Sequence, residues 1–277
     1  MENKKFTDSI LSDRPFELLK KFIYDNTGIY YQDNKRSLLE SRIKKRLTSL
    51  KIETYEEYFQ YLKKNKNENK TFIDAITVKE TYFFRNPNQL EAITSVIAEL
   101  YEGGNHNIKI WSAACSSGEE PYTIAISILE NLKPKYPFLN YSIIGTDISN
   151  KLIEKSIKGN FNKYSLRNTP PDIIQKYFNK DGRYYQIADK IKLLCEFKMV
   201  NLYDDKEICK MKNFDLIICS NVLIYFDLNS KIKVLSNLYK SLNKKGYLFM
   251  GRSETLSELP NKFKMISFPK YIAYKKN

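Results

Sequence analysis

The sequence KIWSAACSSGEEPY, from Lys109 to Tyr122, is the stretch that decides the fold. The apolar residues in 108–113 are typical of a strand buried in a sheet. A turn of small residues follows, and Ser117 is the predicted N-cap of a helix that carries two glutamates and a proline in its first turn. Strand, tight turn and helix in this order are the first unit of a nucleotide-binding α/β sheet.

The two glutamates, Glu119 and Glu120, restrict the nucleotides that fit this turn. A helix N-terminus attracts anions, and dinucleotide enzymes place a pyrophosphate there. Two carboxylates at that end would repel a phosphate and favour a cation or a hydroxyl-rich group. S-adenosylmethionine meets this demand, because it has no phosphate and carries a sulfonium and an ammonium. The alternative is a helix whose acidic first turn only complements its dipole.

The composition predicts a folded, basic protein. Of the 277 residues, 42% are hydrophobic and 14% aromatic, which is enough for one or two domains with a substantial core. The first residues, MENKKFTDS, lack the apolar segment of a signal peptide, and no apolar run is long enough to span a bilayer. We therefore expect a cytoplasmic protein that is not embedded in a membrane.

The net charge of +14 favours an anionic partner, although a lysine-rich composition alone gives the same excess of positive charge.

The cysteines and histidine of the chain disfavour a metal site. The four cysteines form no C-x-x-C pair, and His106 is the single histidine. A zinc site and a disulfide framework both need more ligands or pairs than this pattern offers. We expect neither a metal nor a disulfide framework.

The N-terminal part of the chain, from Asp13 to about Lys70, is predicted to be helical. In the helix predicted over 34–50, leucine and isoleucine recur on one face, and seven basic residues between 35 and 51 oppose a single glutamate. A cationic helix face of this kind suits an acidic protein helix or a nucleic acid backbone. The alternative is a solvated face, which is the more common outcome. A capping box begins the next helix at Thr54, and the polar stretch 64–70 is predicted to end a helix or begin a linker.

Two further positions suggest ligand contacts. Arg85 follows two phenylalanines, whose rigid packing would hold its guanidinium as a fixed fork for a carboxylate. Asp147 stands at the end of a strand predicted over 141–148, where an acid binds ribose hydroxyls in such sheets. The alternatives are a surface arginine beside a core aromatic pair, and an aspartate that only caps a helix, although Ser149 could take that role.

The remaining elements complete an α/β pattern. We predict an irregular segment over 161–178, an inserted hairpin over 184–199, a buried strand over 214–221, a helix over 230–242, a strand over 246–251 and a closing strand pair in the tail. Strands and helices that alternate after a helical leader predict an α/β sheet domain behind an α-helical domain.

Seven motifs follow one another along nearly the whole chain: GIYYQDNKRSLLESRIKKRL, TYFFRNPNQL, WSAACSSGEEPYTIA, GTDIS, NLYD, CSNVLIYFD and GRSETLS. Together they resemble the CheR family, which methylates glutamates of bacterial chemotaxis receptors. The resemblance implies a Rossmann-like S-adenosylmethionine-dependent methyltransferase sheet in 76–277, a small all-α docking domain in 1–75, and a hairpin subdomain inserted at about 180–200.

The resemblance also implies roles for single residues. The cofactor-binding set would be Thr81, Arg85, Ala113, Glu119, Asp147, Asn201, Leu202, Asn221 and Val222. Within it, Asp147 would hold the ribose hydroxyls, and Asn201 and Leu202 would flank the adenine. Arg85 and Tyr225 would be the catalytic residues, with Tyr225 near the transferred methyl group and Arg85 on a carboxylate, for which we favour the cofactor's.

The substrate implied by the resemblance is the acidic, helical cytoplasmic region of a receptor. Its glutamates are ionised at neutral pH, since their ordinary pKa is about 4.3, so no general base is needed. The work of the enzyme would be alignment and exclusion of water. The basic helix face would dock the receptor through Arg42, Lys45 and Arg46.

Three positions depart from the family pattern: Lys79 replaces an asparagine, Ser220 an arginine and Arg252 a histidine. They affect the expected substrate preference more than the reaction type. Ser220 also supports one alternative, a non-catalytic module that binds cofactor and receptor.

Two other enzyme classes fit the sequence less well. The net charge favours a nucleic acid methyltransferase, but the chain lacks the Pro-Pro block of adenine methylation and the Pro-Cys nucleophile of cytosine methylation. We therefore expect no nucleic acid partner. An NAD-dependent enzyme is disfavoured by the two acids at the helix start.

Overall fold

The computed structural model describes residues 11–256 and 261–277, so the polar N-terminal stretch lies outside the described residues. The helices are α1 (Asp13–Thr27), η1 (Asp33–Lys35), α2 (Arg36–Leu50), α3 (Tyr55–Lys64), α4 (Lys66–Ile76), α5 (Pro87–Glu102), α6 (Glu119–Asn131), α7 (Asn150–Lys158), α8 (Pro171–Tyr177), α9 (Asp189–Lys192), α10 (Asp205–Ile208), η2 (Leu223–Tyr225) and α11 (Leu228–Ser241). The strands are β1 (Asn107–Ala113), β2 (Asn140–Asp147), β3 (Asn160–Asn162), β4 (Phe178–Asp181), β5 (Tyr184–Ile187), β6 (Cys195–Met199), β7 (Phe214–Cys219), β8 (Leu242–Met250), β9 (Phe263–Phe268) and β10 (Tyr271–Lys276).

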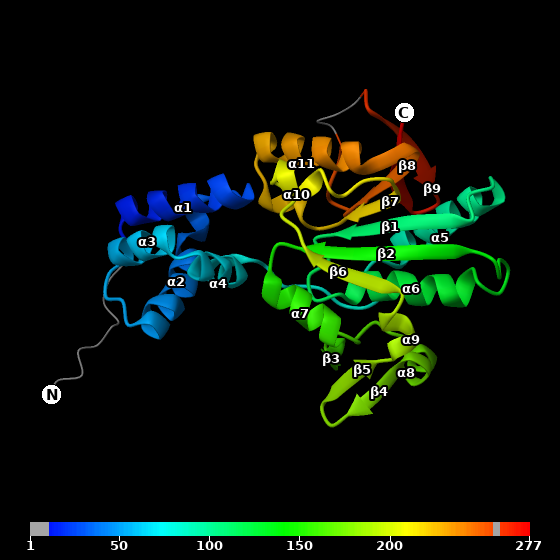
Figure 1. The fold of residues 1–277 in the computed structure, drawn as a ribbon, viewed down its shortest axis with the longest axis horizontal. Helices are drawn as coiled ribbons and strands as arrows, with labels where there is room; N and C mark the ends of the chain where they lie inside the picture. Colours follow the sequence, from blue (N-terminus) through cyan, green and yellow to red (C-terminus); the bar gives the residue numbers. More distant parts are fainter. Residues whose placement is uncertain (1–10, 257–260) are drawn as a thin grey trace.

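A seven-stranded sheet in the order β6-β2-β1-β7-β8-β10-β9 forms the centre of the molecule (Figure 1). The five strands from β6 to β8 are parallel, and β10 and β9 close one edge antiparallel. From β1 the chain first adds β2 on one side and later β7 on the other. The strand order therefore reverses at β1, and ligands of such sheets bind at the carboxyl ends of the strands beside this point.

Helices cover both faces of the sheet, as the α/β prediction requires. Buried residues of α5 and α6 pack with one set of sheet side chains, which includes Ile110 and Phe249. Residues of α10 and α11 pack with the other set, which includes Trp111 and Leu248. Because neighbouring residues of one strand enter opposite cores, the strands are buried on both sides and read as continuous apolar runs.

The predicted strand–turn–helix unit is confirmed, but its helix starts differently. The N-cap of α6 is Gly118, at φ 94°, and not Ser117. A positive φ is accessible to glycine without steric cost, and a Cβ at this position would meet the Cβ of Ser156 at 2.9 Å. The Ser117 hydroxyl instead donates to the Glu119 carboxylate at 2.7 Å.

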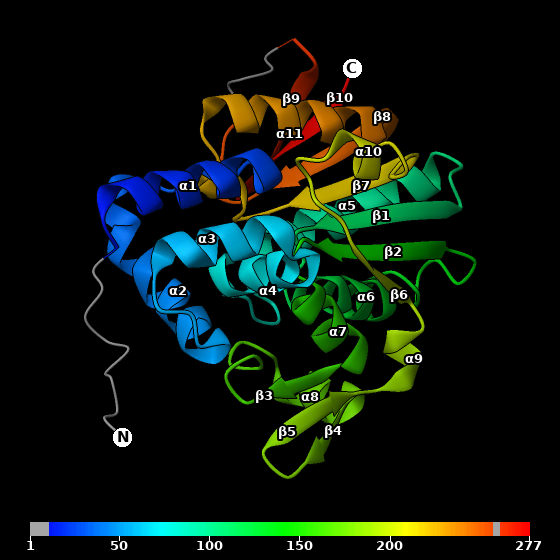
Figure 2. The same ribbon diagram turned by 60° about the vertical axis from the view of Figure 1, so that its left-hand side comes forward.

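Helices α1 to α4 form a separate apolar core beside the carboxyl ends of the parallel strands (Figure 1, Figure 2). Thr54 caps α3 as predicted, and its hydroxyl accepts a hydrogen bond from the Glu57 amide at 3.2 Å. The polar stretch 64–70 is not a linker, because the Asn65 side chain caps α4 and the helix continues to Ile76. The polar, low-complexity sequence of 64–70 therefore contains the start of a helix.

The inserted hairpin exists, but its predicted bounds were wrong. The hairpin consists of β4 and β5, which form a small sheet in the order β3-β5-β4, and the segment predicted as irregular also contains α8. Strand β6, assigned to the hairpin from the sequence, pairs with β2 at the edge of the main sheet. Charged side chains on a half-exposed edge strand resemble those of a hairpin, which explains the error.

Candidate cofactor and substrate site

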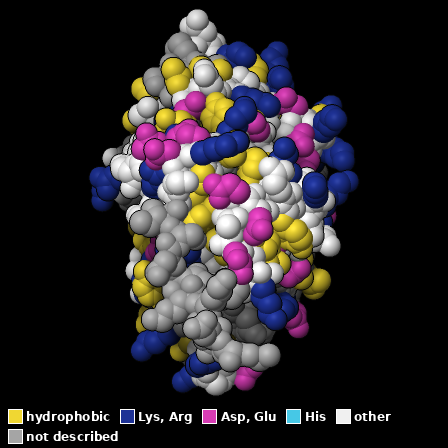
Figure 3. Space-filling view, turned by 90° about the vertical axis from the view of Figure 1, so that its left-hand side faces the viewer, with side chains coloured by type: hydrophobic (Ala, Val, Ile, Leu, Met, Phe, Trp, Pro, Cys, Tyr) yellow, Lys and Arg dark blue, Asp and Glu magenta, His cyan; other side chains and the backbone are white. Residues whose placement is uncertain are grey.

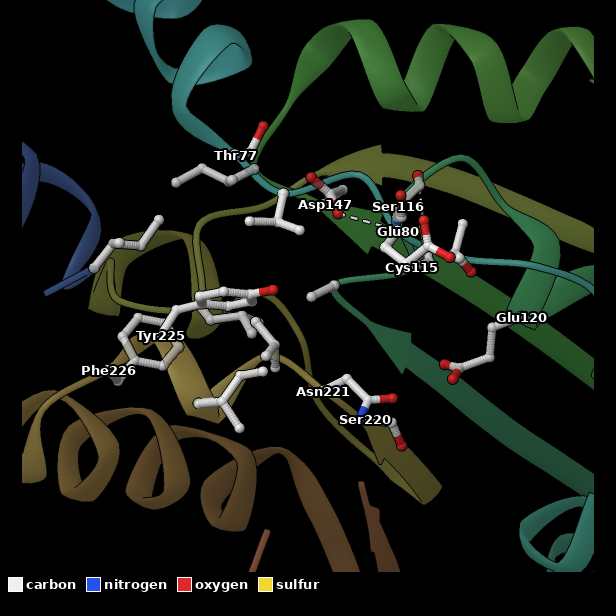
Figure 4. Close-up of a pocket in the computed structure, with 18 of the residues that line it drawn as sticks. Thr77, Glu80, Cys115, Ser116, Glu120, Asp147, Ser220, Asn221, Tyr225 and Phe226 are labelled. Atoms are coloured by element: carbon white, nitrogen blue, oxygen red, sulfur yellow. Dashed lines mark hydrogen bonds between the residues drawn. The ribbon is translucent and has the colours of Figure 1, made fainter. Parts of the chain in front are cut away.

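A large cavity lies at the carboxyl ends of β1, β2, β6 and β7, between the sheet and the helical domain (Figure 4). Most residues of the predicted cofactor set line it, together with Tyr225. These are Thr81, Arg85, Asp147, Asn201, Leu202, Asn221 and Val222. The structure thus brings together side chains from four separate motifs.

Asp147 occupies the end of β2 and accepts two backbone hydrogen bonds. The Ser116 amide donates to its carboxylate at 2.9 Å (Figure 4), and the Ser149 amide donates to it at 2.9 Å. Burial raises the pKa of Asp147 to about 6, while the two amides oppose this shift. Ser149 is the N-cap of α7, so Asp147 is left to face the cavity. The carboxylate is therefore fixed by the backbone and positioned to accept hydroxyl groups.

Of the two glutamates at the start of α6, Glu120 and not Glu119 lines the cavity. Glu119 is buried behind the cavity wall, where its carboxylate accepts the hydroxyls of Ser117 and Ser165. The Glu120 carboxylate accepts the Ser112 hydroxyl at 2.6 Å, and burial raises its pKa to about 7. Glu120 is one of the two acids that the sequence associates with a cationic ligand, but the predicted cofactor-binding set contained only Glu119.

Gly118 fixes the start of the helix that carries both glutamates. Because α6 begins after Gly118, Glu119 is its first residue and Glu120 its second. Successive residues of a helix point about 100° apart, so the two carboxylates lie in different surroundings. Ala113, the last residue of β1, likewise lies outside the cavity lining, which contains its neighbour Ala114.

Arg85 reaches the cavity from the segment between α4 and α5. Its guanidinium donates to the Glu80 carbonyl at 3.1 Å. The preceding Phe84 has φ 56°, a left-handed conformation that costs free energy in a non-glycine residue. Phe83 is fully buried, and its ring packs edge-on against Phe161 at 4.8 Å between centroids. The aromatic pair thus holds the backbone that carries Arg85.

The same segment is clamped from outside by Arg167. Its guanidinium lies 3.5 Å from the ring centre of Tyr82 and 3.7 Å from that of Tyr164. It also pairs with the Glu80 carboxylate at 2.9 Å. These contacts keep Glu80 and Tyr82, both in the cavity wall, in place.

The loop after β7 carries Asn221 and Tyr225 and is held by one carboxylate. Glu254 accepts the amides of Asn221, Leu223 and Gly251 at 2.7 to 2.8 Å. Asn221 has φ 62°, a left-handed conformation that Ala114 and Ser116 of the cavity lining also adopt. The Tyr225 ring extends into the cavity (Figure 4), and burial raises its pKa while Arg85 and Arg42 oppose the shift.

The predicted docking residues lie in three different environments. Arg42 lines the cavity and donates to the Tyr31 hydroxyl at 3.0 Å. Arg46 forms two hydrogen bonds, of 2.9 and 2.8 Å, with the buried carboxylate of Glu68. Lys45 is exposed. The outer face of the helical domain mixes basic with acidic and apolar side chains (Figure 3), so it is not a uniform cationic surface.

The three residues that depart from the family pattern also lie in different environments. Ser220 lines the cavity, and its hydroxyl accepts a hydrogen bond from Gln89 at 2.8 Å. Lys79 and Arg252 are exposed, and Lys79 lies next to two residues of the lining, Val78 and Glu80. Of the three, Ser220 alone has its side chain in the cavity wall.

The polar groups of the cavity fit S-adenosylmethionine. The Ser116 hydroxyl is buried without a hydrogen-bond partner in the described part of the chain, next to Asp147. A buried hydroxyl of this kind costs free energy unless a ligand satisfies it. Arg85 and Glu120 offer opposite charges, which match the carboxylate and ammonium of the cofactor's amino acid end.

Two other properties of the described residues bear on the earlier expectations. Within 11–256 and 261–277, no helix has the length and apolarity needed to cross a membrane. In the same ranges, no three acidic, cysteine or histidine residues are grouped to hold a metal ion. All four cysteines are free.

Comparisons with known proteins agree with this site. The family model for the CheR methyltransferase all-alpha domain matches residues 14–77, and that for its SAM binding domain matches 79–272. The chain is 34% identical to chemotaxis protein methyltransferase 2 of Vibrio cholerae, over 96% of this chain and 94% of that protein. It is 35% identical to the chemotaxis protein methyltransferase of Vibrio parahaemolyticus, over 96% and 98%, and 33% identical to that of Borreliella burgdorferi, over 94% and 93%.

Proposed function

Because the chain belongs to the CheR methyltransferase family and is an S-adenosylmethionine-dependent methyltransferase, we propose that it methylates glutamate side chains of chemotaxis receptors. The product is a glutamate methyl ester, and the substrate is the helical cytoplasmic region of the receptor, so the reaction takes place in the cytoplasm. The observation that supports the proposal is a single cavity. It is lined by charged side chains suited to the cofactor, those of Asp147, Arg85 and Glu120, and it continues past Tyr225 to an exposed rim.

The cofactor-binding roles follow from charge and position. Asp147 accepts the ribose hydroxyls, and Asn201 and Leu202 flank the adenine. Arg85 takes the carboxylate of the methionine moiety, and Glu120 takes its ammonium. Glu120 replaces Glu119 in this proposal, because its carboxylate is the one in the cavity wall.

When bound, S-adenosylmethionine supplies a methyl group activated by its sulfonium. The protein's residues supply alignment, since the substrate glutamate is already ionised. Tyr225 sits on the half-buried loop between the cofactor groups and the rim, where its ring excludes water from the reacting atoms. Arg42 lines the same cavity, and Lys35 lies 6.0 Å from the centre of the Tyr225 ring. These two cations attract the substrate carboxylate to the rim.

The docking role divides among the three predicted residues. We propose 1–75 as the receptor-docking domain and 76–277 as the catalytic domain. Lys45 contacts the receptor directly, Arg42 acts at the cavity wall, and Arg46 supports the helix through Glu68. Asn221 and Val222 close the pocket, and Thr81 contributes to the cofactor wall.

The test is transfer of a labelled methyl group from S-adenosylmethionine to a purified receptor cytoplasmic fragment. Base treatment of the product should release the label as methanol, which identifies a methyl ester. Tyr225→Ala should retain affinity for S-adenosylhomocysteine but lose most of the transfer. Binding without transfer by the unaltered chain, across several receptor fragments, would favour the non-catalytic alternative. Absence of cofactor binding would refute the proposal.

A further inference from the structure

The helical domain forms hydrogen bonds with each of three cavity loops of the sheet domain. The contacts are from Ser149 to Asp74 after β2, from Asn201 to the Asn26 carbonyl after β6, and from the Tyr30 amide to the Tyr225 carbonyl after β7. These loops carry the proposed ribose, adenine and methyl-transfer residues. The helical domain is thus joined to the cofactor site and not only to its rim.

The contact after β2 differs from the other two because it uses a charged side chain. Asp74 lies in the last turn of α4 and accepts the Ser149 hydroxyl at 2.5 Å and, more weakly, the Lys151 amide at 3.4 Å. Ser149 is fully buried, and its hydroxyl also accepts the Leu152 amide at the start of α7. A charge-assisted hydrogen bond of this length is among the stronger ones.

Ser149 transmits this contact to Asp147. The Ser149 amide donates to one carboxylate oxygen of Asp147 at 2.9 Å, while the Ser149 hydroxyl donates to Asp74. A single residue therefore connects the carboxylates of two domains. If Asp74 is removed, the Ser149 side chain loses its acceptor, and the backbone amide that orients Asp147 is less constrained.

We propose that Asp74 is a positioning residue for S-adenosylmethionine: through Ser149 it orients the Asp147 carboxylate, so the helical domain sets how tightly the sheet domain holds the cofactor. The proposal rests on the ribose-binding role of Asp147. It also assigns the docking domain a part in cofactor binding, whereas its predicted role was limited to the receptor.

The charges around the two aspartates give a readout that a merely structural role does not have. Asp147 faces Asp74 from α4 and the Cys115 thiol from the turn after β1. The negative charge of Asp74 adds to burial in raising the pKa of Asp147. On its other side Asp74 is near Lys79, whose pKa is lowered first by burial and then by Lys151. Loss of the Asp74 charge should lower the pKa of Asp147.

The experiment measures binding of S-adenosylhomocysteine to the full chain by calorimetry between pH 5 and 8. We expect Asp74→Ala to weaken binding at pH 8 about tenfold, as for loss of one charge-assisted hydrogen bond. Asp74→Asn keeps an oxygen acceptor and should lose about threefold or less. In both variants the acid midpoint of binding should move to lower pH. Asp25→Ala, which removes an exposed carboxylate from α1, is the control and should change neither.

Ser149→Ala and the double variant Asp74→Ala/Ser149→Ala test the route. The double variant should bind no more weakly than the weaker single variant, since both remove the same contact. Additive losses of affinity in the double variant would overturn the inference. It would also be overturned if Asp74→Ala kept its affinity within twofold of the unaltered chain and its acid midpoint did not move. Thermal unfolding identifies variants that fail to fold, and if Asp74→Ala is one of them, Asp74→Asn replaces it in the experiment.

Asp147→Ala separates this inference from the function on which it rests. If Asp147→Ala loses binding and Asp74→Ala does not, the positioning role alone fails. If Asp147→Ala binds S-adenosylhomocysteine normally, the ribose role fails and the inference fails with it.

Discussion

The sheet domain and the helical domain contribute to one cavity by different physical means. The sheet domain presents groups at strand ends, where the backbone fixes their direction: Asp147 is held by two amides and the 221–225 loop by Glu254. The helical domain presents basic side chains from the surface of α2, and two of its three predicted docking residues form internal hydrogen bonds.

The comparison shows that position in the sequence indicates a residue's role at the end of a strand but not on the face of a helix. In a parallel sheet the carboxyl end of a strand is a ligand edge whatever the details of packing. On a helix, the position of a charged residue in the sequence does not show whether its side chain faces solvent, a partner or another helix. Such a side chain can also pair with a group inside its own domain, as Arg46 does with Glu68. Five predictions, from the largest expected effect to the smallest, test this contrast.

Arg46→Ala should destabilise the protein most. It leaves the Glu68 carboxylate, 4% exposed, without its cation, and removal of one partner from a buried pair costs about 3 kcal/mol. Chemical denaturation measures the loss. Arg46→Ala combined with Glu68→Gln should recover part of it, because the uncompensated charge is gone. An unchanged free energy of unfolding would instead favour a docking role for Arg46.

Arg85→Ala should weaken binding of S-adenosylmethionine about 30-fold, since a charge-assisted hydrogen bond to a carboxylate contributes about 2 kcal/mol. Arg85→Lys should recover only a part, because a lysine cannot form the planar fork. Equilibrium binding of labelled cofactor gives both values. Normal cofactor affinity with lost turnover would move Arg85 to the substrate carboxylate.

Cofactor affinity and stability should respond to pH in opposite directions. Burial raises the pKa of Glu120 to about 7 and that of Asp147 to about 6, so the folded protein binds these protons more tightly than the unfolded chain. Their contribution to the free energy of unfolding therefore falls as pH rises from about 4 to 7. Cofactor affinity should rise over this range, by at most about tenfold per pH unit for each proton released.

Glu120→Gln removes one of the two titrating carboxyl groups that are expected to govern the pH dependence of cofactor affinity. The inflection of cofactor affinity near pH 7 should disappear, while the inflection near pH 6 from Asp147 remains. Glu119→Gln is the matched control on the same helix turn. Loss of the upper inflection in the Glu119 variant alone would return the ammonium contact to Glu119.

Lys45→Ala should have the smallest effect. An exposed cation contributes less than about 1 kcal/mol, so receptor methylation should fall about two- to threefold at low salt and hardly at all at high salt. Stability should not change, in contrast to Arg46→Ala one residue away. Initial rates of receptor methylation at two ionic strengths provide the check.

The sequence predicted those features that depend on local pattern. The strand before Asp147, the serine cap at 149 and the α/β alternation all follow from apolar period and capping chemistry. The family resemblance placed Glu119 in the cofactor set, and local pattern alone does not show which of two adjacent acids at a helix start faces the ligand.

Features that depend on distant partners could not be predicted in the same way. Glu68 stands in a polar stretch that looks like a linker, and its partner Arg46 lies 22 residues away. The register that adds β6 to the main sheet is fixed by pairing with β2, which is not visible in the sequence of β6 itself. Asp74 likewise acquires its proposed role only when two domains meet.

The contact between the Tyr24 hydroxyl and Asp227 joins residues 203 positions apart, and the neighbouring Ile29–Phe226 bridge spans a similar distance. The four helices of the N-terminal domain have contacts close in sequence and can form early, whereas long-range closures form late. A ribosome must therefore synthesise more than four fifths of the chain before the part of the cavity wall that contains Tyr225 can form. During synthesis the helical domain precedes the sheet domain, and the loop with Tyr225 is the last of the three cavity loops to be joined to it.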